Sequence, residues 1–319
     1  MAVGLLIGFF SGLASALLFY SAARGAPLLG TLLVILTPLP SLLAGFGWGW
    51  LPAAAGAVAG AAAMAYAADP HFAAGYGLAL GVPAALATYL AHLSRPSAGD
   101  KSSREFYPPG HLIAAMALYA GLLPLLILPL IGGSYDVLKS PLDDFYRQLA
   151  AKAAPELGLK ELSDQQLAAL ADLTVILLPG AFAAYWLGIF TLNLYLAGRI
   201  ARASGRLERD WPDLAAMSLP AGFPLLIALA LAAAFVPGAL SVVGSSFTGG
   251  LLFAYLLAGL ALIHYLARHR APWILWLVYA ALIVFGPYAA LAITLGGLID
   301  QPLKLKRRIG GHPPGHLKP

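Results

Sequence analysis

Four polar side chains lie inside long apolar stretches and are the best candidates for chemistry in this sequence. Tyr185 and Asn193 belong to one stretch, and Tyr255 and His264 belong to a later one. Polar groups at membrane depth are costly, and they commonly serve a ligand or a neighbouring helix. We therefore interpret the four as a candidate ligand-binding set. Two alternatives stay open: Asn193 bonds a neighbouring helix, and His264 packs or reaches the surface near a helix end.

No pattern in the sequence indicates catalysis or a metal site. The chain contains no cysteine, which excludes thiol chemistry and disulfides. Its histidines lack the H-E-x-x-H spacing, and His312 and His316 are separated by two prolines that prevent a helix. No P-loop sequence is present. The adjacent Asp143 and Asp144 point in different directions on a helix and are interpreted as a solvated surface. We expect a protein that is not an enzyme and uses no cofactor or metal.

The composition places these side chains in a membrane. The chain is 60% hydrophobic and 10% charged, with a mean hydropathy of +0.81, whereas soluble domains carry about 25% charged residues. This composition predicts an all-α, polytopic transmembrane bundle with eight to nine hydrophobic segments, each about 20 residues long. The nine candidates are 2–22, 28–46, 50–68, 72–92, 111–132, 172–197, 217–237, 246–267 and 272–298.

The polar breaks divide the chain into four parts. Residues 1–132 form the N-terminal transmembrane helices, and 172–300 form the C-terminal ones. Between them, 133–171 is an acidic helical insert, in which Ser163 and Gln166 have the spacing of a capping box. Residues 301–319 are expected to be a basic, disordered tail.

Basic clusters near span ends account for the net charge of +5 and do not indicate nucleic-acid binding. If the basic loops 93–110 and 198–210 face the cytoplasm, then the N-terminus does too and the insert is extracytoplasmic. The C-terminal third fits this scheme less simply, because cations flank both ends of 272–298. A broken or re-entrant element within 217–267 gives eight crossings and a cytoplasmic tail, which we favour over nine crossings and an external tail.

Small residues repeat every four positions in the first span. Gly4, Gly8, Gly12 and Ala16 share one helix face, where backbones can approach closely. The stripe predicts either packing against another helix of this chain or docking of a partner helix.

Two basic stretches are candidate contact surfaces. Residues 199–214 carry four arginines and Trp211, and form either a lipid-facing linker or a docking site. The end of the last span has Asp300 followed by cations. Contact of Asp300 with Arg307, Arg308 or the arginine surface 199–209 would latch the tail, whereas Pro302 breaks its helical spacing to Lys304. The cations that follow Asp300 are Lys304, Lys306, Arg307 and Arg308. They serve either in this latch or as the positively charged signal that ends the last span.

Three stretches together resemble the YybS-like family of predicted bacterial membrane proteins, a domain of unknown function. They are "LTPLPSLLAGFGWG" (36–49), "LAGLALIHYLARH" (257–269) and "LGGLIDQPLKLKRR" (295–308). The family is distantly similar to the S components of energy-coupling-factor (ECF) transporters, which bind a micronutrient in the membrane and dock through a first helix to a T subunit with two ATPases.

This resemblance implies an S-component-like core in the bacterial cytoplasmic membrane, with the insert as an addition. The expected function is substrate binding for a small-molecule transporter. The alternative is a membrane scaffold or assembly factor that acts through 133–171 or Arg199–Arg209. A membrane enzyme for lipid substrates is the weakest hypothesis, because clustered intramembrane acids, bases and metal ligands are missing.

Overall fold

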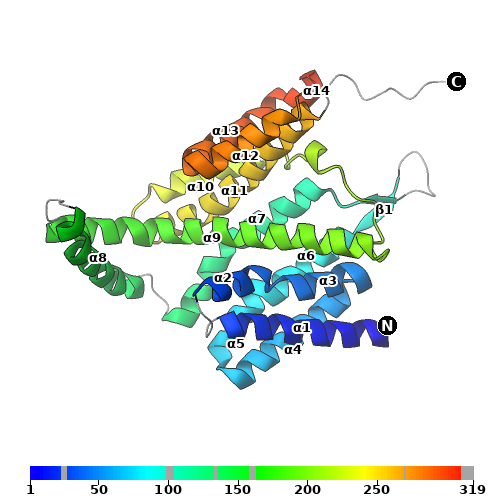
Figure 1. The fold of residues 1–319 in the computed structure, drawn as a ribbon, viewed down its shortest axis with the longest axis horizontal. Coiled ribbons are helices and arrows are strands. Elements are labelled where there is room, and N and C mark those ends of the chain that lie inside the picture. The colour runs from blue at the N-terminus through cyan, green and yellow to red at the C-terminus, as the bar shows by residue number, and fades with distance from the viewer. Residues whose placement is uncertain (23–26, 98–103, 133–135, 158–162, 269–270, 310–319) are drawn as a thin grey trace.

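The computed structural model describes residues 1–22, 27–97, 104–132, 136–157, 163–268 and 271–309, and nearly all of them are helical (Figure 1). The first lobe of the bundle is built from α1 (Ala2–Ala22), α2 (Pro27–Leu36), α3 (Leu39–Trp48), α4 (Trp50–Ala67), α5 (Pro70–Tyr76), the π-helical η1 (Gly77–Gly81) and α6 (Val82–His92). A short antiparallel hairpin follows, made of β1 (Ser94–Pro96) and β2 (Arg104–Phe106).

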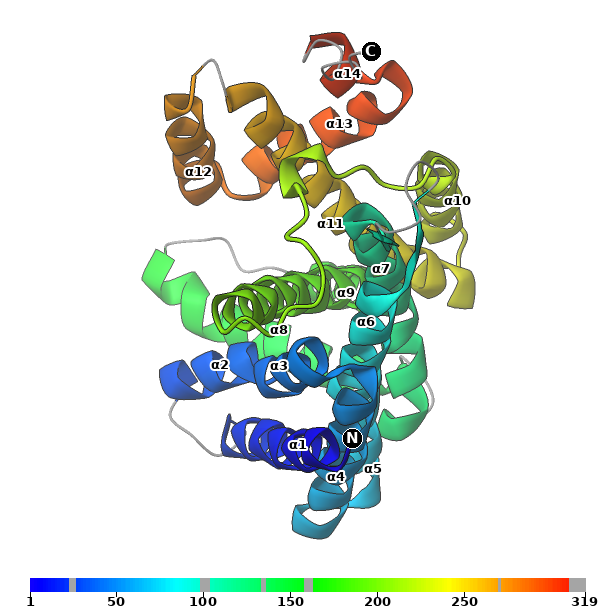
Figure 2. The same cartoon turned by 90° about the vertical axis from the view of Figure 1, so that its right-hand side faces the viewer.

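The middle of the chain holds α7 (Pro109–Ile127), the 3₁₀ turn η2 (Leu128–Ile131), α8 (Asp136–Leu157), α9 (Asp164–Ala203) and the 3₁₀ turn η3 (Leu214–Ala216). The second lobe comprises α10 (Phe223–Ala234), α11 (Ala239–Ala267), α12 (Trp273–Phe285), α13 (Pro287–Leu303) and α14 (Leu305–Ile309). Seen end-on, α7 and α9 lie between the two lobes (Figure 2).

The all-α polytopic bundle expected from composition is confirmed. Among the described residues, seven segments are long and apolar enough to cross a membrane. Three of them are composite: α2 and α3 together form one, α5, η1 and α6 form another, and α7 with most of η2 forms the third. Helices α10 and α12 are apolar but shorter. With 12 residues, α10 is about 18 Å long, less than the roughly 30 Å hydrocarbon core.

The π-helical turn has an identifiable cause in Pro83. Proline has no N–H, so it cannot donate to the carbonyl of Ala79 four residues earlier. The indole Nε1 of Trp186 on α9 donates to that carbonyl at 2.8 Å, and the hydroxyl of Tyr119 on α7 donates to Leu78 O at 2.6 Å. The interruption therefore fastens the first lobe to the two central helices.

The capping box predicted near the C-terminal end of the insert is present, but the boundary predicted at residue 171 does not coincide with the end of a helix. Ser163 and Gln166 form the expected capping box, with both reciprocal hydrogen bonds present. However, α9 runs without a break from Asp164, so the boundary drawn at 171 falls inside this helix. Helix α8 is held to α9 by an ion pair of Lys139 with Asp172 at 2.5 Å and lies beyond the bundle (Figure 1).

The broken element expected within 217–267 corresponds to the short helix α10, after which the chain turns at Gly238. A second break, which was not expected, lies at Gly286. Helix α11 continues through Ala239–Ala267, whereas Gly286 adopts a φ of 46° and Pro287 begins a new helix. Glycine tolerates this left-handed conformation and proline cannot continue the preceding helix. The span expected at 272–298 is therefore two antiparallel helices.

This hairpin removes the conflict between the two cationic ends. The N-terminus, the β1–β2 hairpin and α14 lie at one end of the bundle, and α8 lies at the other (Figure 1). Arg268 and the cations that follow Leu303 are thus at the same end, because α12 leaves it and α13 returns to it. The positive-inside rule predicts that this end faces the cytoplasm, and this stays a prediction.

Candidate functional site

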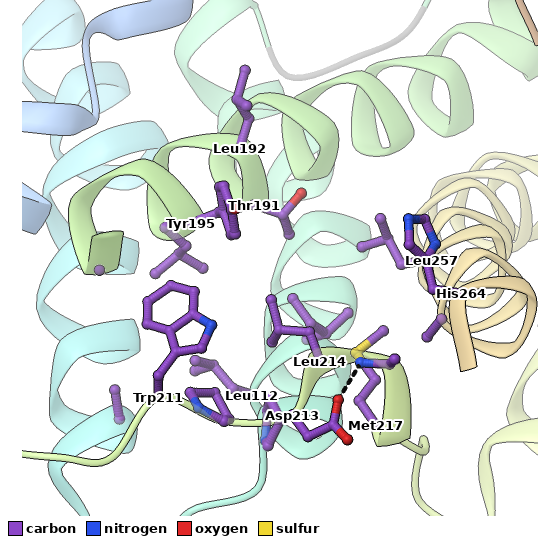
Figure 3. A pocket seen from close by; sticks show the side chains of 18 of the residues that line it. Leu112, Thr191, Leu192, Tyr195, Trp211, Asp213, Leu214, Met217, Leu257 and His264 are labelled. Carbon is purple, nitrogen blue, oxygen red and sulfur yellow. Dashed lines mark hydrogen bonds between the residues drawn. The ribbon is translucent and has the colours of Figure 1, made fainter. Parts of the chain in front are cut away.

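A large cleft lies between the central helices and the second lobe. Its volume is about 1170 Å³, and its walls come from α7, α9, α11, α12 and the connecting segment 207–217. Thr191 and Tyr195 from α9, Trp211 and Asp213 from the segment, and His264 from α11 line it together (Figure 3). The central helices α7 and α9 and the second-lobe helices α11 and α12 thus contribute to one site.

An ion pair lies at the loop end of the cleft. Arg268 donates from Nη1 to Asp213 Oδ2 at 2.8 Å and from Nη2 to Asp213 Oδ1 at 2.5 Å. These hydrogen bonds lower the pKa of Asp213 and raise that of Arg268. Asp213 also accepts from the backbone N–H of Ala215 at 3.1 Å, which fixes the start of η3. The pair therefore anchors the connecting segment to the end of α11.

Trp211 extends the wall between this pair and α9. Its ring lies 5.7 Å from that of Tyr195, edge to face, and the guanidinium carbons of Arg199 and Arg202 lie 5.7 and 5.8 Å from its centroid. Cation–π contacts of exposed cations such as these contribute modestly, about 0.5–1 kcal/mol each. The arginines predicted as a docking surface are thus partly engaged with an aromatic residue of their own chain.

On the opposite wall, His264 is oriented by two hydrogen bonds. Its Nδ1 lies 2.8 Å from Leu260 O, a carbonyl that can only accept, so Nδ1 carries the proton. In the neutral ring Nε2 then accepts, and the hydroxyl of Tyr279 on α12 lies 3.3 Å away. The histidine thereby links α11 to the otherwise lightly packed α12, none of whose residues is buried.

Arg209 is the cation of the cleft without a carboxylate partner. Of the ion pairs in the part of the chain that the structure describes, none includes it. Its Nη1 donates to Ala91 O at 3.3 Å, and its guanidinium carbon lies 5.4 Å from the ring centroid of Phe106. Its Nε is buried without a hydrogen-bond partner. Burial lowers the pKa of Arg209, which indicates the cost of desolvating this charge.

The cleft becomes apolar toward the middle of the membrane. Leu192, Phe253 and Leu257 line this part. Leu192 lies about 17 Å along α9 from its end at Ala203, and Phe253 lies about 21 Å along α11 from its end. Since the hydrocarbon core is roughly 30 Å thick, helix ends near the membrane surface would place these residues deep within it. The site is therefore amphipathic along its length.

Of the four side chains predicted to bind a ligand, His264 alone lines this cleft. Asn193 is fully buried, and its Nδ2 donates to Ile35 O at 2.6 Å and to Ile189 O at 2.8 Å. The structure thus places it at a contact of α9 with α2, the alternative left open above. Its Oδ1 is buried without a partner.

Tyr185 and Tyr255 lie elsewhere. Tyr185 is 56% exposed and borders a shallow hollow between α2, α9 and α11, which shares Gly188, Leu192 and Phe253 with the cleft. Tyr255 is fully buried, and its hydroxyl donates to Gln301 Oε1 at 2.7 Å. The amide of Gln301 in turn donates to Pro220 O at 2.6 Å. Tyr255 therefore holds α11, α13 and the segment before α10 together.

The small-residue stripe on α1 faces α4. Gly4, Gly8, Gly12 and Ala16 are all buried. A Cβ on Gly8 would lie 2.1 Å from Pro52 O, and one on Gly12 would lie 2.0 Å from a backbone oxygen of α4, so the glycines allow the two backbones to touch. This is the internal packing left open above. Docking of another helix on this face would require α1 and α4 to separate.

Asp300 is paired, but with Lys306. The Nζ of Lys306 lies 3.7 Å from Asp300 Oδ2, and its backbone N–H donates to Oδ1 at 3.2 Å. The same Nζ donates to Met217 O at 2.5 Å, in the wall of the cleft. Burial lowers the pKa of Lys306, although Asp300 opposes the shift. The pair is thus a contact between α14, α13 and the connecting segment.

The remaining predicted latch residues differ in their roles. Lys304 ends α13 with a φ of 51°, and its N–H donates to Asp300 O at 2.7 Å. Arg308 is exposed. The side chain of Arg307 lies outside the described residues, and so does the tail 310–319. Gly296 and Gly297 lie within α13, which continues to Leu303, and Gly297 packs against Tyr255 O.

Sequence reasoning missed most of the cleft. Trp211 was placed in a basic linker or docking surface, and no role was predicted for Asp213, Arg268 or Tyr279. The pairing of Asp213 with Arg268 joins residues 55 positions apart, which no local spacing could reveal. One available signal was the unusual density of polar and aromatic residues in "RDWPDL" (209–214) between two apolar segments.

Comparison with known proteins gives a family without an activity. The sequence pattern of a family described as "Predicted membrane protein (DUF2232)" matches residues 13–301. No curated protein and no solved structure matches the chain. The expected resemblance to a family of predicted membrane proteins of unknown function is confirmed, while the further similarity to S components stays a prediction.

Proposed function

We propose that this chain, which belongs to the Predicted membrane protein (DUF2232) family, binds a small molecule in its cleft and serves as the substrate-binding subunit of a membrane transporter. The observation that carries this proposal is the cleft itself, whose roughly 1170 Å³ would hold a sizeable ligand. Ligand sites are concave and mostly apolar, with a few polar groups that fix orientation. Trp211, Asp213 and His264 supply such groups at one end.

Binding rather than catalysis suits this arrangement. Asp213 is engaged by Arg268, and His264 by Leu260 and Tyr279, so both are held in place by structural hydrogen bonds. Within the described residues, no group of three metal-ligating side chains comes together. The protein is thus proposed to be a non-enzymatic, multi-pass protein of the bacterial cytoplasmic membrane, without a cofactor of its own.

A transporter subunit needs a source of energy, and the proposed partner is a transmembrane T-like subunit with ATPases. The proposed contact is the first helix, as the S-component resemblance implies. Since the glycine face of α1 is packed on α4, the partner would meet the opposite face. That face exposes Val3, Leu6, Phe10 and Leu17, each more than half accessible. In the absence of a partner it would contact lipid.

The direct test is native mass spectrometry of the protein extracted from its own membrane. We expect a non-covalently bound small molecule, and we expect Leu257→Trp to remove it because the larger side chain fills the apolar half of the cleft. Leu177→Trp on the exposed face of α9 is the matched control and should retain the ligand. A protein that carries no ligand, and purifies with no T-like or ATPase subunit, would overturn the proposal.

The second candidate function is a scaffold that acts through the insert. It is favoured by α8, which projects from the bundle on a framework fixed by the pairs of Lys139 with Asp172 and Arg147 with Asp164, and exposes Phe145 and Leu149. The arginine surface is a weaker basis, because Arg199 and Arg202 contact Trp211. Deleting 140–157 should abolish a scaffold's function and leave ligand binding in the cleft intact.

A further inference from the structure

The charge of the cleft points to one class of ligand, and this inference rests on the proposed binding function. Apart from two tyrosines, four ionisable side chains line the cleft: Arg209, Asp213, His264 and Arg268. Asp213 and Arg268 neutralise each other through two hydrogen bonds. Histidine carries no negative charge in either protonation state, so the positive charge of Arg209 is left uncompensated among the described lining residues.

Arg209 is also incompletely solvated. It is half-buried, its Nε is enclosed without a hydrogen-bond partner, and one carbonyl, Ala91 O, accepts from its guanidinium at 3.3 Å. The flanking Glu208 and Asp210 are exposed and form no ion pair with it in the part of the chain that the structure describes. A guanidinium has five N–H donors in a planar fork that matches a carboxylate or a phosphate. An anion in the cleft would supply acceptors to the terminal nitrogens of this guanidinium, for which Ala91 O is the one acceptor within the described residues.

The rest of the cleft favours a long apolar body on this anion. The polar residues Arg209, Trp211 and Asp213 are at the loop end, whereas Leu192 and Phe253 line the part near the middle of the membrane. A small inorganic anion would leave this apolar part unused, and a wholly apolar molecule would leave Arg209 desolvated and unpaired. An amphiphile with its anionic head at Arg209 satisfies both ends.

We propose that the cleft binds an anionic amphiphile, with a carboxylate or phosphate head at Arg209 and an apolar body along Leu192, Phe253 and Leu257. The exposed Arg199 and Arg202 at the same end would raise the local concentration of such a ligand near the cleft. Binding of this class is expected to weaken as salt increases, because the head contacts a positively charged group near the membrane surface.

The test measures probe binding to the full-length protein in nanodiscs of zwitterionic phosphatidylcholine, with empty nanodiscs as the baseline for partitioning into lipid. The probes are dodecyl phosphate, the neutral dodecanoylglycerol and inorganic phosphate. We expect dodecyl phosphate to bind at least about tenfold more tightly than either of the others, the size of one charge-assisted hydrogen bond. Arg209→Gln should remove this preference and leave dodecanoylglycerol binding within about twofold.

Two variants separate loss of recognition from loss of the fold. Arg206→Gln is the matched control, because Arg206 is in the same connection but lies 4.6 Å over Trp48 and does not line the cleft. It should leave the preference unchanged. Arg209→Lys keeps the charge without the planar fork, and should bind dodecyl phosphate with intermediate affinity. If Arg209→Gln does not fold, then Arg209→Lys and the comparison of probes on the unaltered protein show whether Arg209 recognises the anionic head.

The possible outcomes bear on the two proposals differently. Equal binding of dodecyl phosphate and dodecanoylglycerol, or a preference that survives Arg209→Gln, would overturn the anionic ligand but leave a binding cleft. Inorganic phosphate as tight as dodecyl phosphate would overturn the amphiphile. Failure of all probes to bind, together with the absence of a co-purifying ligand, would overturn the proposed function itself.

Discussion

Replacing Gly12 by leucine tests whether the small-residue stripe is an internal contact. A Cβ at Gly12 would lie 2.0 Å from Gly56 O, whereas ordinary contact begins at 3.4 Å. The two backbones would therefore have to separate by about 1.4 Å, and the rest of the leucine side chain would need still more room. Overpacking of this kind costs about 1–3 kcal/mol. We expect Gly12→Leu to fall in the upper half of that range, because its neighbour is backbone and cannot rotate away.

The measurement is reversible unfolding of the purified protein in mixed micelles. Ala14→Leu is the control: it adds the same side chain to α1 at an exposed position and should be nearly neutral. Both changes increase the hydrophobicity of α1, so neither should impair its insertion, and a difference between them reports packing. Equal stability of the two variants would contradict the close contact of α1 with α4, and would return the stripe to consideration as a docking face for another protein.

Other contacts give predictions of smaller scope. Tyr255→Phe should lower the free energy of unfolding by about 1–3 kcal/mol, because Gln301 loses its buried donor, and should speed hydrogen exchange in α13; unchanged exchange there would contradict this. Arg268 holds the pKa of Asp213 below its ordinary value, so this pair adds stability above about pH 4 that is lost as the pH falls through the lower folded value. As both partners are nearly half exposed, the contribution should stay below about 1 kcal/mol. Melting of Asp213→Asn should therefore differ more from the unaltered protein at pH 7 than at pH 2.5, and an equal difference at both would contradict this. Ser163→Ala should cost about 0.5–2 kcal/mol at the start of α9, seen as faster exchange of the first helical amides; unaltered exchange would show that the cap is dispensable.

Local features of this protein could be predicted from its sequence. The capping box at Ser163 needs two residues three positions apart, and the membrane bundle follows from composition. The basic loops 93–110 and 198–210 were expected at the same end of the bundle, because loops rich in arginine and lysine tend to face the same side of the membrane. The break at Gly286 was missed although Gly-Pro is a strong signal, because the apolar residues on both sides have the length of one span.

Contacts between distant segments could not be predicted in the same way. Asn193 bonds Ile35, 158 positions earlier, and Asp213 bonds Arg268 across two helices. Which polar residue faces a cleft and which faces a helix depends on the rotation of each helix about its axis, and packing of the whole bundle fixes that rotation. Tyr255 shows the consequence: it shares an apolar span with His264 but faces α13 and not the cleft.

Photolabelling tests the central claim most directly. An amphiphile with a carboxylate head and a photoreactive group in its apolar chain would be bound to the protein in nanodiscs, crosslinked, and the labelled peptides identified by mass spectrometry. The account predicts labels at Leu192, Phe253 and Leu257, competed by excess dodecyl phosphate and lost in Leu257→Trp. Labels spread over exposed lipid-facing residues such as Leu6 and Phe10, without competition, would contradict a ligand-binding cleft.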